Sequence, residues 1–369
     1  MDEIKITEQQ HRIITAPEDK VVVMSSAGTS KTFCLIERIK WLVSQGTLPS
    51  HIVAITFTNN AAQEIINRLE PLQIGFCGTV HSFANFLLHT EQIATRETIE
   101  SEDFDELFNL VKQNPRCVNN FPVDHLLLDE AQDSNNHQFE FILEMVNPKR
   151  FTILGDEKQT IYAFAGSNPD LIVNLSQTDG VATYKLSENF RNSRVIHEFA
   201  KWAIERMNCG YYDNSTLMRD EMGKKITILY NLETVANYIL QDGKFGEWFV
   251  LTRTNAQLET VKSYLESRGI FCDTFKQKEV NLGQLQEKMK QNTVKVLTIH
   301  SSKGLQQKKV VVIGATIPEP NYYTHRVPLD MVEEGRLAYV AITRAQDFLL
   351  WVKRRRVKKE QEQKFRSWE

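Results

Sequence analysis

The sequence lacks the features of a disulfide-stabilised or membrane-spanning protein. Its five cysteines are scattered, their number is odd, and none of them forms a C-x-x-C pair, which argues against both a disulfide framework and a zinc site. We therefore expect reduced thiols and a cytoplasmic location. No apolar run is long enough to cross a bilayer, and the first residues, Met1–Lys5, do not read as a signal peptide.

A strong charge of one sign is also missing. The formal net charge is −3 over 369 residues, so composition does not indicate a nucleic-acid binder. Only the stretch Lys353–Lys359 is locally basic, and it is either a solvated, partly helical end or a contact for a partner. Hydrophobic residues make up 41% and charged residues 25% of the chain, which is an ordinary composition for a globular protein. The length favours two domains, at roughly 150 residues per domain.

Short apolar runs alternate with helical stretches along the chain. This alternation predicts an α/β fold with parallel sheets covered by helices. We place the boundary near residue 190, which gives a first lobe of residues 1–190 and a second lobe of residues 191–369. Residues 86–121 contain no clear strand and are predicted to form a small helical insertion in the first lobe. The strand-like runs are Val21–Met24, His51–Phe57, His125–Asp129, Phe151–Leu154, Lys225–Tyr230, Trp248–Thr252, Thr293–Ile299, Val310–Ile313 and Phe348–Val352.

A loop of small residues lacks the glycines that its pattern requires. Residues 21–32 read VVVMSSAGTSKT, an apolar strand followed by the loop and then a helix, and such a loop can hold phosphates on its backbone N–H groups. Lys31 would then reach the β- and γ-phosphates, and the Thr32 hydroxyl would ligate Mg²⁺. However, Ser25 and Ser30 occupy the glycine places of G-x-x-x-x-G-K-[ST]. Taken alone, the stretch is equally well an ordinary strand-to-helix turn.

A second segment carries two adjacent carboxylates. Residues 126–133 read LLLDEAQD, a buried strand that ends in Asp129 and Glu130. In a nucleotide site Asp129 would hold Mg²⁺ through water, and Glu130 would orient or deprotonate the attacking water. The alternative is a solvated acidic cluster at a strand end. The Lys31–Thr32 pair about a hundred residues earlier favours the nucleotide site.

A third segment combines a polar turn with aromatic residues. Residues 152–166 read TILGDEKQTIYAFAG, in which Gln159 follows a strand and Tyr162 and Phe164 come next. Polar groups that face a phosphate, with aromatic platforms beyond them, would couple a nucleotide to stacked bases. Aromatic residues are more often core residues, but the small neighbours of these two leave room beside the rings.

The order and wording of these segments resemble the UvrD/Rep/PcrA group of superfamily 1 helicases. The matches run in family order from residue 6 to about residue 350. The further matching segments are ITEQQ at 6–10, AITFTNNAA at 54–62, GTVHSF at 78–83, LSENFR at 186–191, LTRTNAQ at 251–257, TIHSSKGLQ at 298–306 and RLAYVAITRA at 336–345.

The resemblance implies two RecA-like P-loop NTPase lobes that bind ATP and Mg²⁺ between them. It also implies an ATP-dependent translocase or helicase that moves 3′→5′ on single-stranded DNA. The implied catalytic residues are Lys31, Glu130, Gln159, Arg191 and Arg344, with both arginines on the second lobe. The implied nucleotide contacts are Gln10, Ser26, Ala27, Gly28, Thr29, Ser30, Lys31, Thr32, Phe33, Phe190 and Gln306, and the implied metal contacts are Thr32 and Asp129. The implied DNA contacts are Thr56, Phe57, Asn59, His81, Tyr162, Phe164, Thr298, His300 and Ser302.

The chain departs from the family in its loop and in its length. Ser26 and Ser30 stand where the family has glycines, and a positive φ at Ser30 would cost about 1–2 kcal/mol. Gln306 replaces a glutamate, Phe33 replaces an arginine near the adenine, and Ala165 replaces an arginine on the DNA backbone. The loss at Ala165 should weaken the grip on DNA. Both of the family's insert domains are largely missing.

These departures keep two other functions open. One is a nucleotide-gated DNA-binding or scaffold subunit with little hydrolysis, which the altered loop favours. The other is a motor subunit that needs a protein partner such as a nuclease, in a repair or antiphage-defence complex, which the missing inserts and the basic stretch favour.

Overall fold

The computed structural model describes residues 6–70, 72–93, 104–207, 210, 212–276, 279–320 and 328–353. The chain forms two compact units, and each is described here by itself. Unit 1 contains Met1–Arg191, Tyr212–Met218 and Gln277–Leu285, and unit 2 contains Asn192–Tyr211, Arg219–Lys276 and Gln286–Glu369. The long segment of unit 1 thus ends at Arg191. Unit 1 also includes two later segments, so one boundary in the sequence does not separate the two units. The basic stretch after Lys353 lies outside the described residues.

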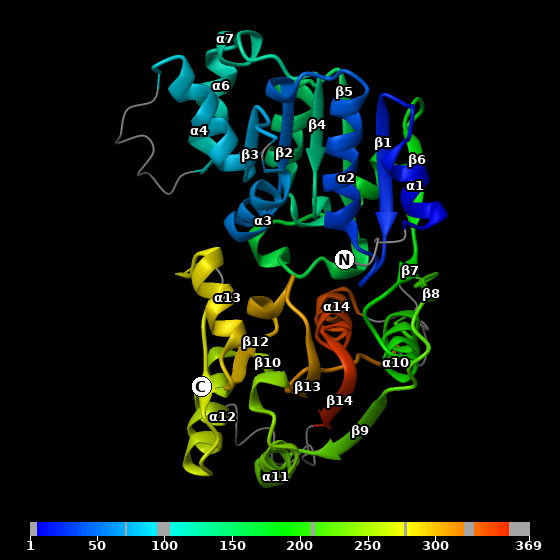
Figure 1. The fold of residues 1–369 in the computed structure, drawn as a ribbon, viewed down its shortest axis with the longest axis vertical. Coiled ribbons are helices and arrows are strands. Elements are labelled where there is room, and N and C mark those ends of the chain that lie inside the picture. Colours follow the sequence, from blue (N-terminus) through cyan, green and yellow to red (C-terminus); the bar gives the residue numbers. More distant parts are fainter. Residues whose placement is uncertain are drawn as a thin grey trace. The chain divides into compact units, whose positions relative to one another are not determined.

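Unit 1 is built on a six-stranded sheet in which all strands are parallel (Figure 1). The strand order is β3-β2-β4-β5-β1-β6, so β1 lies between β5 and β6. Parallel strands need crossover connections, and helices supply them. The strands are β1 Lys20–Ser25, β2 Ile52–Ile55, β3 Phe76–Gly78, β4 His125–Leu128, β5 Arg150–Gly155 and β6 Ala182–Leu186, and a separate parallel pair joins β7 Glu188–Asn189 to β8 Thr216–Leu217.

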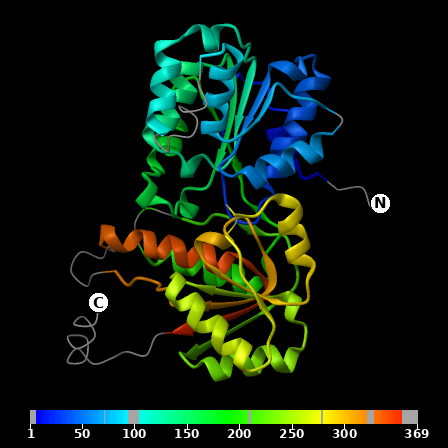
Figure 2. The same cartoon turned by 90° about the vertical axis from the view of Figure 1, so that its left-hand side faces the viewer.

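Alternate residues of each strand in unit 1 pack on opposite faces of the sheet, as the two-residue period of a strand requires. Val21 and Val23 belong to one apolar cluster and Val22 to the other, so both faces are covered, as Figure 2 shows. One face carries α1 Glu8–Ile14, α2 Lys31–Ser44 and α3 Asn59–Leu69. The other carries α4 Val80–Thr90, α6 Phe104–Gln113, α7 Arg116–Asn119, α8 Asn136–Glu140, the π-helix η3 Phe141–Val146 and α9 Asp170–Leu175.

The predicted helical insertion is confirmed in the part of residues 86–121 that the structure describes. This part contains the end of α4 together with α6 and α7, and no strand. Phe86 and Phe121 pack edge to face with ring centroids 5.2 Å apart, and Phe108 stacks on Phe141 at 4.8 Å. The insertion therefore has an aromatic core that is continuous with one face of the sheet.

Unit 2 repeats the design with the strand order β11-β12-β10-β13-β14-β9, again with all strands parallel. Helices α11 and α12 cover one face, and on the other face Phe199 of α10 packs its ring against Trp351 of β14. The strands are β9 Lys224–Leu229, β10 Trp248–Thr252, β11 Cys272–Asp273, β12 Val294–Thr298, β13 Gln307–Ile313 and β14 Ala345–Lys353. The helices are α10 Arg194–Glu205, α11 Leu232–Asp242, α12 Asn255–Ser267, α13 Leu282–Lys290 and α14 Leu329–Thr343.

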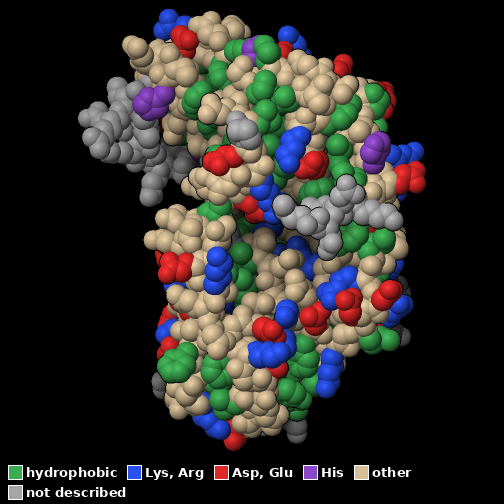
Figure 3. Space-filling view, in the orientation of Figure 1, with side chains coloured by type: hydrophobic (Ala, Val, Ile, Leu, Met, Phe, Trp, Pro, Cys, Tyr) green, Lys and Arg blue, Asp and Glu red, His purple; other side chains and the backbone are tan. Residues whose placement is uncertain are grey.

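Both sheets confirm the predicted α/β fold of parallel strands flanked by helices. None of the described helices is long and apolar enough to span a bilayer. On the face of each unit drawn in Figure 3, basic and acidic side chains are interspersed, as expected for a net charge of −3.

Candidate functional site

The carboxyl ends of three neighbouring strands form the edge at which ligands bind in parallel sheets. Strands β4, β5 and β1 are adjacent in unit 1. The small-residue loop follows β1, the two carboxylates follow β4, and the turn with Gln159 follows β5. The fold therefore gathers at one edge three segments that lie far apart in the sequence.

The loop after β1 adopts the backbone conformation for which glycine is favoured. Gly28 has φ +75° and Ser30 has φ +65° with ψ +40°, a left-handed conformation. At Ser30 a non-glycine residue costs about 1–2 kcal/mol, and the Ser30 side chain makes no capping hydrogen bond that offsets this cost. Ser25 and Ser26 have no positive φ. The predicted strain therefore applies to Ser30 alone.

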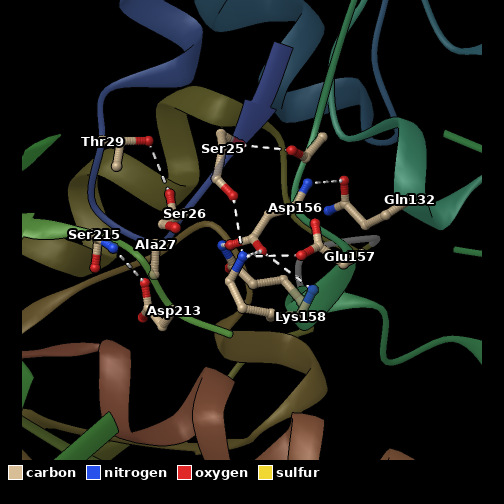
Figure 4. Close-up of polar contacts among 12 residues, drawn as sticks. Ser25, Ser26, Ala27, Thr29, Gln132, Asp156, Glu157, Lys158, Asp213 and Ser215 are labelled. Atoms are coloured by element: carbon tan, nitrogen blue, oxygen red, sulfur yellow. Dashed lines mark hydrogen bonds and ion pairs between the residues drawn. The ribbon is translucent and has the colours of Figure 1, made fainter. Parts of the chain in front are cut away.

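Hydroxyl groups of the loop bond within the loop and to the neighbouring strand, as Figure 4 shows. The Ser25 Oγ donates to the carbonyl oxygen of Gly155 on β5 over 2.7 Å, and the Thr29 Oγ1 donates to the carbonyl oxygen of Ser26 over 2.8 Å. These bonds fix the loop between β1 and β5. The serine that replaces the first pattern glycine thus has a structural partner.

Residues 189–191 hold the outer side of the loop. The Asn189 Nδ2 donates to the carbonyl oxygen of Ala27 and the Phe190 backbone N–H donates to that of Gly28, each over 3.0 Å. A Cβ atom on Gly28 would lie 2.8 Å from the Cβ of Arg191, so the glycine is required for this approach as well as for its φ. Arg191, expected on the second lobe, is the last residue of the long segment of unit 1, and unit 2 begins at Asn192.

The two carboxylates lie beside the first turn of α2. The Thr32 Oγ1 donates to Oδ2 of Asp129 over 3.0 Å, and Lys31 Nζ lies 3.9 Å from Oε1 of Glu130. Burial and the neighbouring Glu130 raise the pKa of Asp129 to about 6, although Lys31 and the hydroxyl of Thr32 act in the opposite direction.

Mg²⁺ fits this group of oxygen atoms. A buried carboxylate with a raised pKa gains from a second positive charge, and a hydroxyl and a carboxylate are ligands that Mg²⁺ accepts. No group of three or more metal-ligating His, Cys, Asp or Glu side chains exists among the described residues. Water or phosphate oxygens would therefore have to complete the shell, as is usual for Mg²⁺ bound with a nucleotide.

Gln132, which was not predicted as a site residue, connects the carboxylate of Glu130 to the end of β5. Its Nε2 donates to Oε2 of Glu130, and its Oε1 accepts the backbone N–H of Asp156 over 2.9 Å (Figure 4). The side chain is completely buried. Gln132 thus sets the carboxylate of Glu130 relative to the end of β5.

Gln159 is held in the turn after β5 by Asp156. The short helix η4 Glu157–Gln159 follows the strand, and the Gln159 Nε2 donates to Oδ2 of Asp156 over 2.7 Å. Both side chains are buried. The sequence analysis selected Gln159 and missed the aspartate that orients it.

Helix α1 places Gln10 through a capping box. The Gln10 backbone N–H donates to Oγ1 of Thr7 over 3.3 Å, and the Thr7 backbone N–H donates to Oε1 of Gln10 over 3.1 Å. The amide plane of Gln10 is therefore set by the start of its own helix. Two further predicted nucleotide contacts differ in burial: Phe33 packs against the apolar core, whereas Phe190 is 37% exposed.

The buried Arg38 fastens α1 to α2. Its Nη1 donates to three carbonyl oxygens at the end of α1, and its Nε donates to Oγ1 of Thr152 over 2.8 Å. Burial lowers the pKa of Arg38 to about 10, so the guanidinium stays charged near neutral pH. The three acceptors belong to Ile13, Ile14 and Ala16.

Three of the predicted DNA-contacting residues form an aromatic group in unit 1. The rings of Phe57 and Tyr162 are stacked with centroids 5.0 Å apart, and Phe164 meets Tyr162 edge-on at 5.9 Å. Phe164 is 76% exposed. Asn59 begins α3 close by in the chain.

Two further predicted DNA contacts of unit 1 are turned toward the protein. His81 stacks on Phe108 of the insertion with centroids 5.4 Å apart. The Thr56 side chain is 1% exposed, and its Oγ1 has no hydrogen-bond partner among the described residues. Neither side chain belongs to the aromatic group of Phe57, Tyr162 and Phe164.

The predicted DNA contacts of unit 2 lie around the carboxyl end of β12. Thr298 ends this strand, its Oγ1 donates to Oγ of Ser301, and His300 and Ser302 form the short helix that follows. Ser302 Oγ donates to the carbonyl oxygen of Ile299 over 2.7 Å. Gln306 is exposed directly before β13.

Arg344 is bound to its own unit. Its Nε donates to the carbonyl oxygen of Val340 over 3.1 Å, and its Nη1 donates to that of Leu305 over 3.2 Å. The side chain is 1% exposed. These bonds orient the guanidinium within unit 2.

Two family models match this chain. The family model for the UvrD/REP helicase N-terminal domain matches residues 6–115 and 95–179, and that for the UvrD-like helicase C-terminal domain matches residues 277–355. The chain is 24% identical to a probable DNA helicase of Mycoplasma pneumoniae, over 94% of this chain and 83% of that protein.

Two longer relatives match with similar identity. DNA helicase II of Escherichia coli is 24% identical over 70% of this chain, and a putative ATP-dependent DNA helicase of Acanthamoeba polyphaga mimivirus is 26% identical over 92% of it. The chain spans about half the length of these two proteins, 50% and 52% respectively. The residues matched by the two family models cover most of the sequence in family order, and the chain belongs to the UvrD/Rep family of DNA helicases.

Proposed function

We propose that the protein is an ATP-dependent translocase or helicase of single-stranded DNA that works with Mg²⁺ in the cytoplasm. The observation that carries this proposal is the junction of α2 with the end of β4. There, Lys31 and Thr32 lie beside Asp129 and Glu130. A lysine, a hydroxyl and two carboxylates at the edge of a parallel sheet are the groups that ATP hydrolysis requires.

Each group has a distinct task in the proposed reaction. The backbone N–H groups of residues 26–31 and the ammonium of Lys31 would hold the phosphates. Thr32 and Asp129 would hold Mg²⁺, which would supply positive charge to the bound phosphates. Glu130 would orient the attacking water and accept its proton. Gln159, held by Asp156, would orient the same water or the γ-phosphate.

Two arginines would stabilise the negative charge that spreads over the transferring phosphoryl group. Arg191 lies beside the loop at Gly28, and Arg344 is the second candidate by resemblance. Arginines in this role contribute roughly 10³–10⁵ in rate. Gln10 and Phe190 would contact the adenine, and Gln306 the ribose.

The aromatic group of Phe57, Tyr162 and Phe164, of which Phe164 is exposed, supports binding of single-stranded DNA. Bases can stack on Phe57, Tyr162 and Phe164 without regard to sequence, which is what a motor on DNA needs. The 3′→5′ direction is proposed from the family alone. Phosphate contacts should make the affinity for DNA fall as salt rises.

The second candidate function is a motor or DNA-binding subunit with weak ATPase on its own, within a complex that contains a protein partner such as a nuclease. The left-handed Ser30 favours it. Strain at the residue directly before Lys31 opposes the loop conformation that the phosphates need.

A steady-state ATPase assay with and without single-stranded DNA tests both candidates. We expect turnover that DNA stimulates and that Lys31→Ala removes. Turnover that stays at background and equals that of Lys31→Ala contradicts the enzyme. Turnover that appears only after addition of a co-purifying protein supports the second candidate.

A further inference from the structure

A lysine is buried directly beneath the phosphate loop. Lys158 lies in the turn after β5, and its side chain is 3% exposed. Its two carboxylate neighbours are buried as well: Asp156 is 0% exposed, and Glu157 has an oxygen, Oε2, that is buried without a hydrogen-bond partner among the described residues. Such a group of buried charges is costly to form and needs a reason.

The Lys158 ammonium joins the turn to the loop, as the labelled side chains in Figure 4 show. Its Nζ lies 2.9 Å from Oδ1 of Asp156 and 3.2 Å from Oε1 of Glu157, and it donates to the carbonyl oxygen of Ser25 over 3.3 Å. Ser25 is the last residue of β1, where the phosphate loop begins. One cation thus contacts both segments that would border the phosphates.

The ammonium stays charged in this position. Burial acts to lower the pKa of Lys158, but Asp156, Glu157 and the more distant Asp213 outweigh it and hold that pKa above its ordinary value. The three oxygen atoms around Nζ match the three protons that an ammonium can donate.

Asp156 connects Lys158 to Gln159, because its carboxylate contacts both side chains. While Oδ1 of Asp156 faces the ammonium, its Oδ2 accepts the Gln159 Nε2 over 2.7 Å. The backbone N–H of Lys158 also donates to Oδ1, and that of Gln159 donates to the carbonyl oxygen of Asp156. The carboxylate therefore cannot rotate without releasing the amide of Gln159.

We infer that Lys158 is a positioning residue for ATP hydrolysis, which ties the start of the phosphate loop at Ser25 to Gln159 through the carboxylate of Asp156. This inference rests on the proposed function. It predicts that Lys158 acts on the chemical step through Gln159 and contributes little to the affinity for the nucleotide.

Loss of the lysine would free Gln159 for a physical reason. Without the ammonium, the buried carboxylates of Asp156 and Glu157 repel each other, and Asp156 would take up a proton or turn toward water. Either change weakens the bond from Asp156 to the Gln159 amide. The loop would also lose its tie at Ser25.

A double-mutant cycle tests this coupling. We expect Lys158→Met to lower kcat of the DNA-stimulated ATPase by about tenfold or more, as loss of about 1.4 kcal/mol of positioning would do. The Kd of a fluorescent ATP analogue should change less than threefold. In a Gln159→Ala background the same substitution should lower kcat less than twofold, because there is no amide left to position.

Lys309→Met is the matched control. Lys309 on β13 of unit 2 is likewise held by two carboxylates, those of Asp242 and Glu247. Removing it disrupts a comparable ion pair away from the loop, so we expect kcat to stay within twofold of the wild type.

Hydrogen exchange in the nucleotide-free protein gives a readout that does not depend on turnover. Lys158→Met should speed exchange of the backbone N–H groups at positions 158 and 159 at least tenfold, because both donate to Asp156 in the wild type. Equal loss of kcat in both backgrounds, or unchanged exchange, would overturn the inference.

The experiments also cover two other results: a Lys158→Met variant that does not fold, and a wild type without ATPase activity. If Lys158→Met does not fold, Asp156→Asn in both backgrounds replaces it, and an equal loss of kcat in each again overturns the inference. If the wild type shows no turnover above Lys31→Ala, the proposed function fails, and the exchange of these amides decides separately whether Lys158 fixes the turn.

Discussion

The Thr32 hydroxyl donates a hydrogen bond to Oδ2 of Asp129 over 3.0 Å, and this contact joins the first turn of α2 to the end of β4. It brings together two segments that are 97 residues apart in the sequence. This hydroxyl, the Lys31 ammonium and the backbone N–H of Glu130 do not outweigh burial and the charge of Glu130, and the pKa of Asp129 stays raised.

The stability of the metal-free protein should therefore depend on the charge of Asp129. Its pKa rises from 3.8 to about 6 on folding, so its favourable contribution is complete below pH 4 and is lost as pH rises through 6. At pH 7.5 Asp129→Asn should raise the free energy of unfolding by about 1–3 kcal/mol, since one pKa unit is worth about 1.4 kcal/mol.

Urea unfolding in EDTA at pH 4 and pH 7.5 measures this effect. Most of the gain should disappear at pH 4, where Asp129 in the folded protein is neutral, as asparagine is. Asp179→Asn, at an exposed position, is the control and should show no such gain at pH 7.5. An equal gain at both pH values would mean that charge is not the cause.

The strain at Ser30 predicts a difference between two small substitutions. Ser30→Gly should raise the free energy of unfolding by up to about 1 kcal/mol, because glycine adopts a positive φ freely but loses more entropy on folding. Ser30→Ala keeps the Cβ atom and removes a hydroxyl that caps nothing, so it should change little. Chemical denaturation and the Kd for ATP are the measurements. Identical values for the two variants would show that Ser30 is not strained.

Phe164 should contribute to DNA binding by stacking. Phe164→Ala should weaken binding to single-stranded DNA by about tenfold, within the ~1–3 kcal/mol per stacked base. The slope of affinity against salt should not change, because no phosphate contact is lost. Fluorescence anisotropy at several salt concentrations measures both quantities. Phe271→Ala in unit 2 is the matched control, since Phe271 is 72% exposed; equal losses would count against a specific platform.

Arg38 should be essential for the stability of unit 1. Arg38→Met removes the guanidinium from the carbonyl oxygens of Ile13, Ile14 and Ala16, which should cost about 3 kcal/mol or more. Arg68→Met, at an exposed site paired with Glu64, should cost less than about 1 kcal/mol. Urea unfolding provides the comparison. A small cost for Arg38→Met would mean that water replaces the guanidinium.

The two candidate arginines should respond differently to substitution. Arg344 donates to carbonyl oxygens within unit 2, so Arg344→Met should lower both stability, by about 2–4 kcal/mol, and kcat. Arg191→Met should lower kcat by about 10³-fold or more with little change in stability. Thermal unfolding and steady-state kinetics separate the two effects, and loss of stability without loss of kcat would remove either arginine from the proposed reaction.

The central strands and the edge strand β9 could be predicted from the sequence, whereas the edge strands β3, β6 and β11 could not. Strands such as β4 and β10 are buried along their whole length and therefore read as continuous apolar runs. At the edges, β6 alternates with exposed residues and β3 has only three residues. Neither leaves a clear apolar run.

The candidate site was predictable where a motif carries it and hidden where tertiary contacts carry it. Lys31, Asp129 and Gln159 stand in recognisable segments. Gln132 and Lys158 act on partners 24 and 133 residues away, so only the order of the strands reveals them. From the sequence, strain at Ser30 could be predicted only on the condition that its φ is positive. The structure gives Ser30 a positive φ.

The bonds from Asn189 and Phe190 to the loop have a mechanical consequence. Unit 1 ends its long segment at Arg191, and Asn192 already belongs to unit 2. Ala27 and Gly28 are thus clamped to the last residues before the crossing, with no slack chain between them. A displacement of this loop would therefore reach residues 189–190 through these two bonds, directly before the chain passes from unit 1 to unit 2 at residues 191–192.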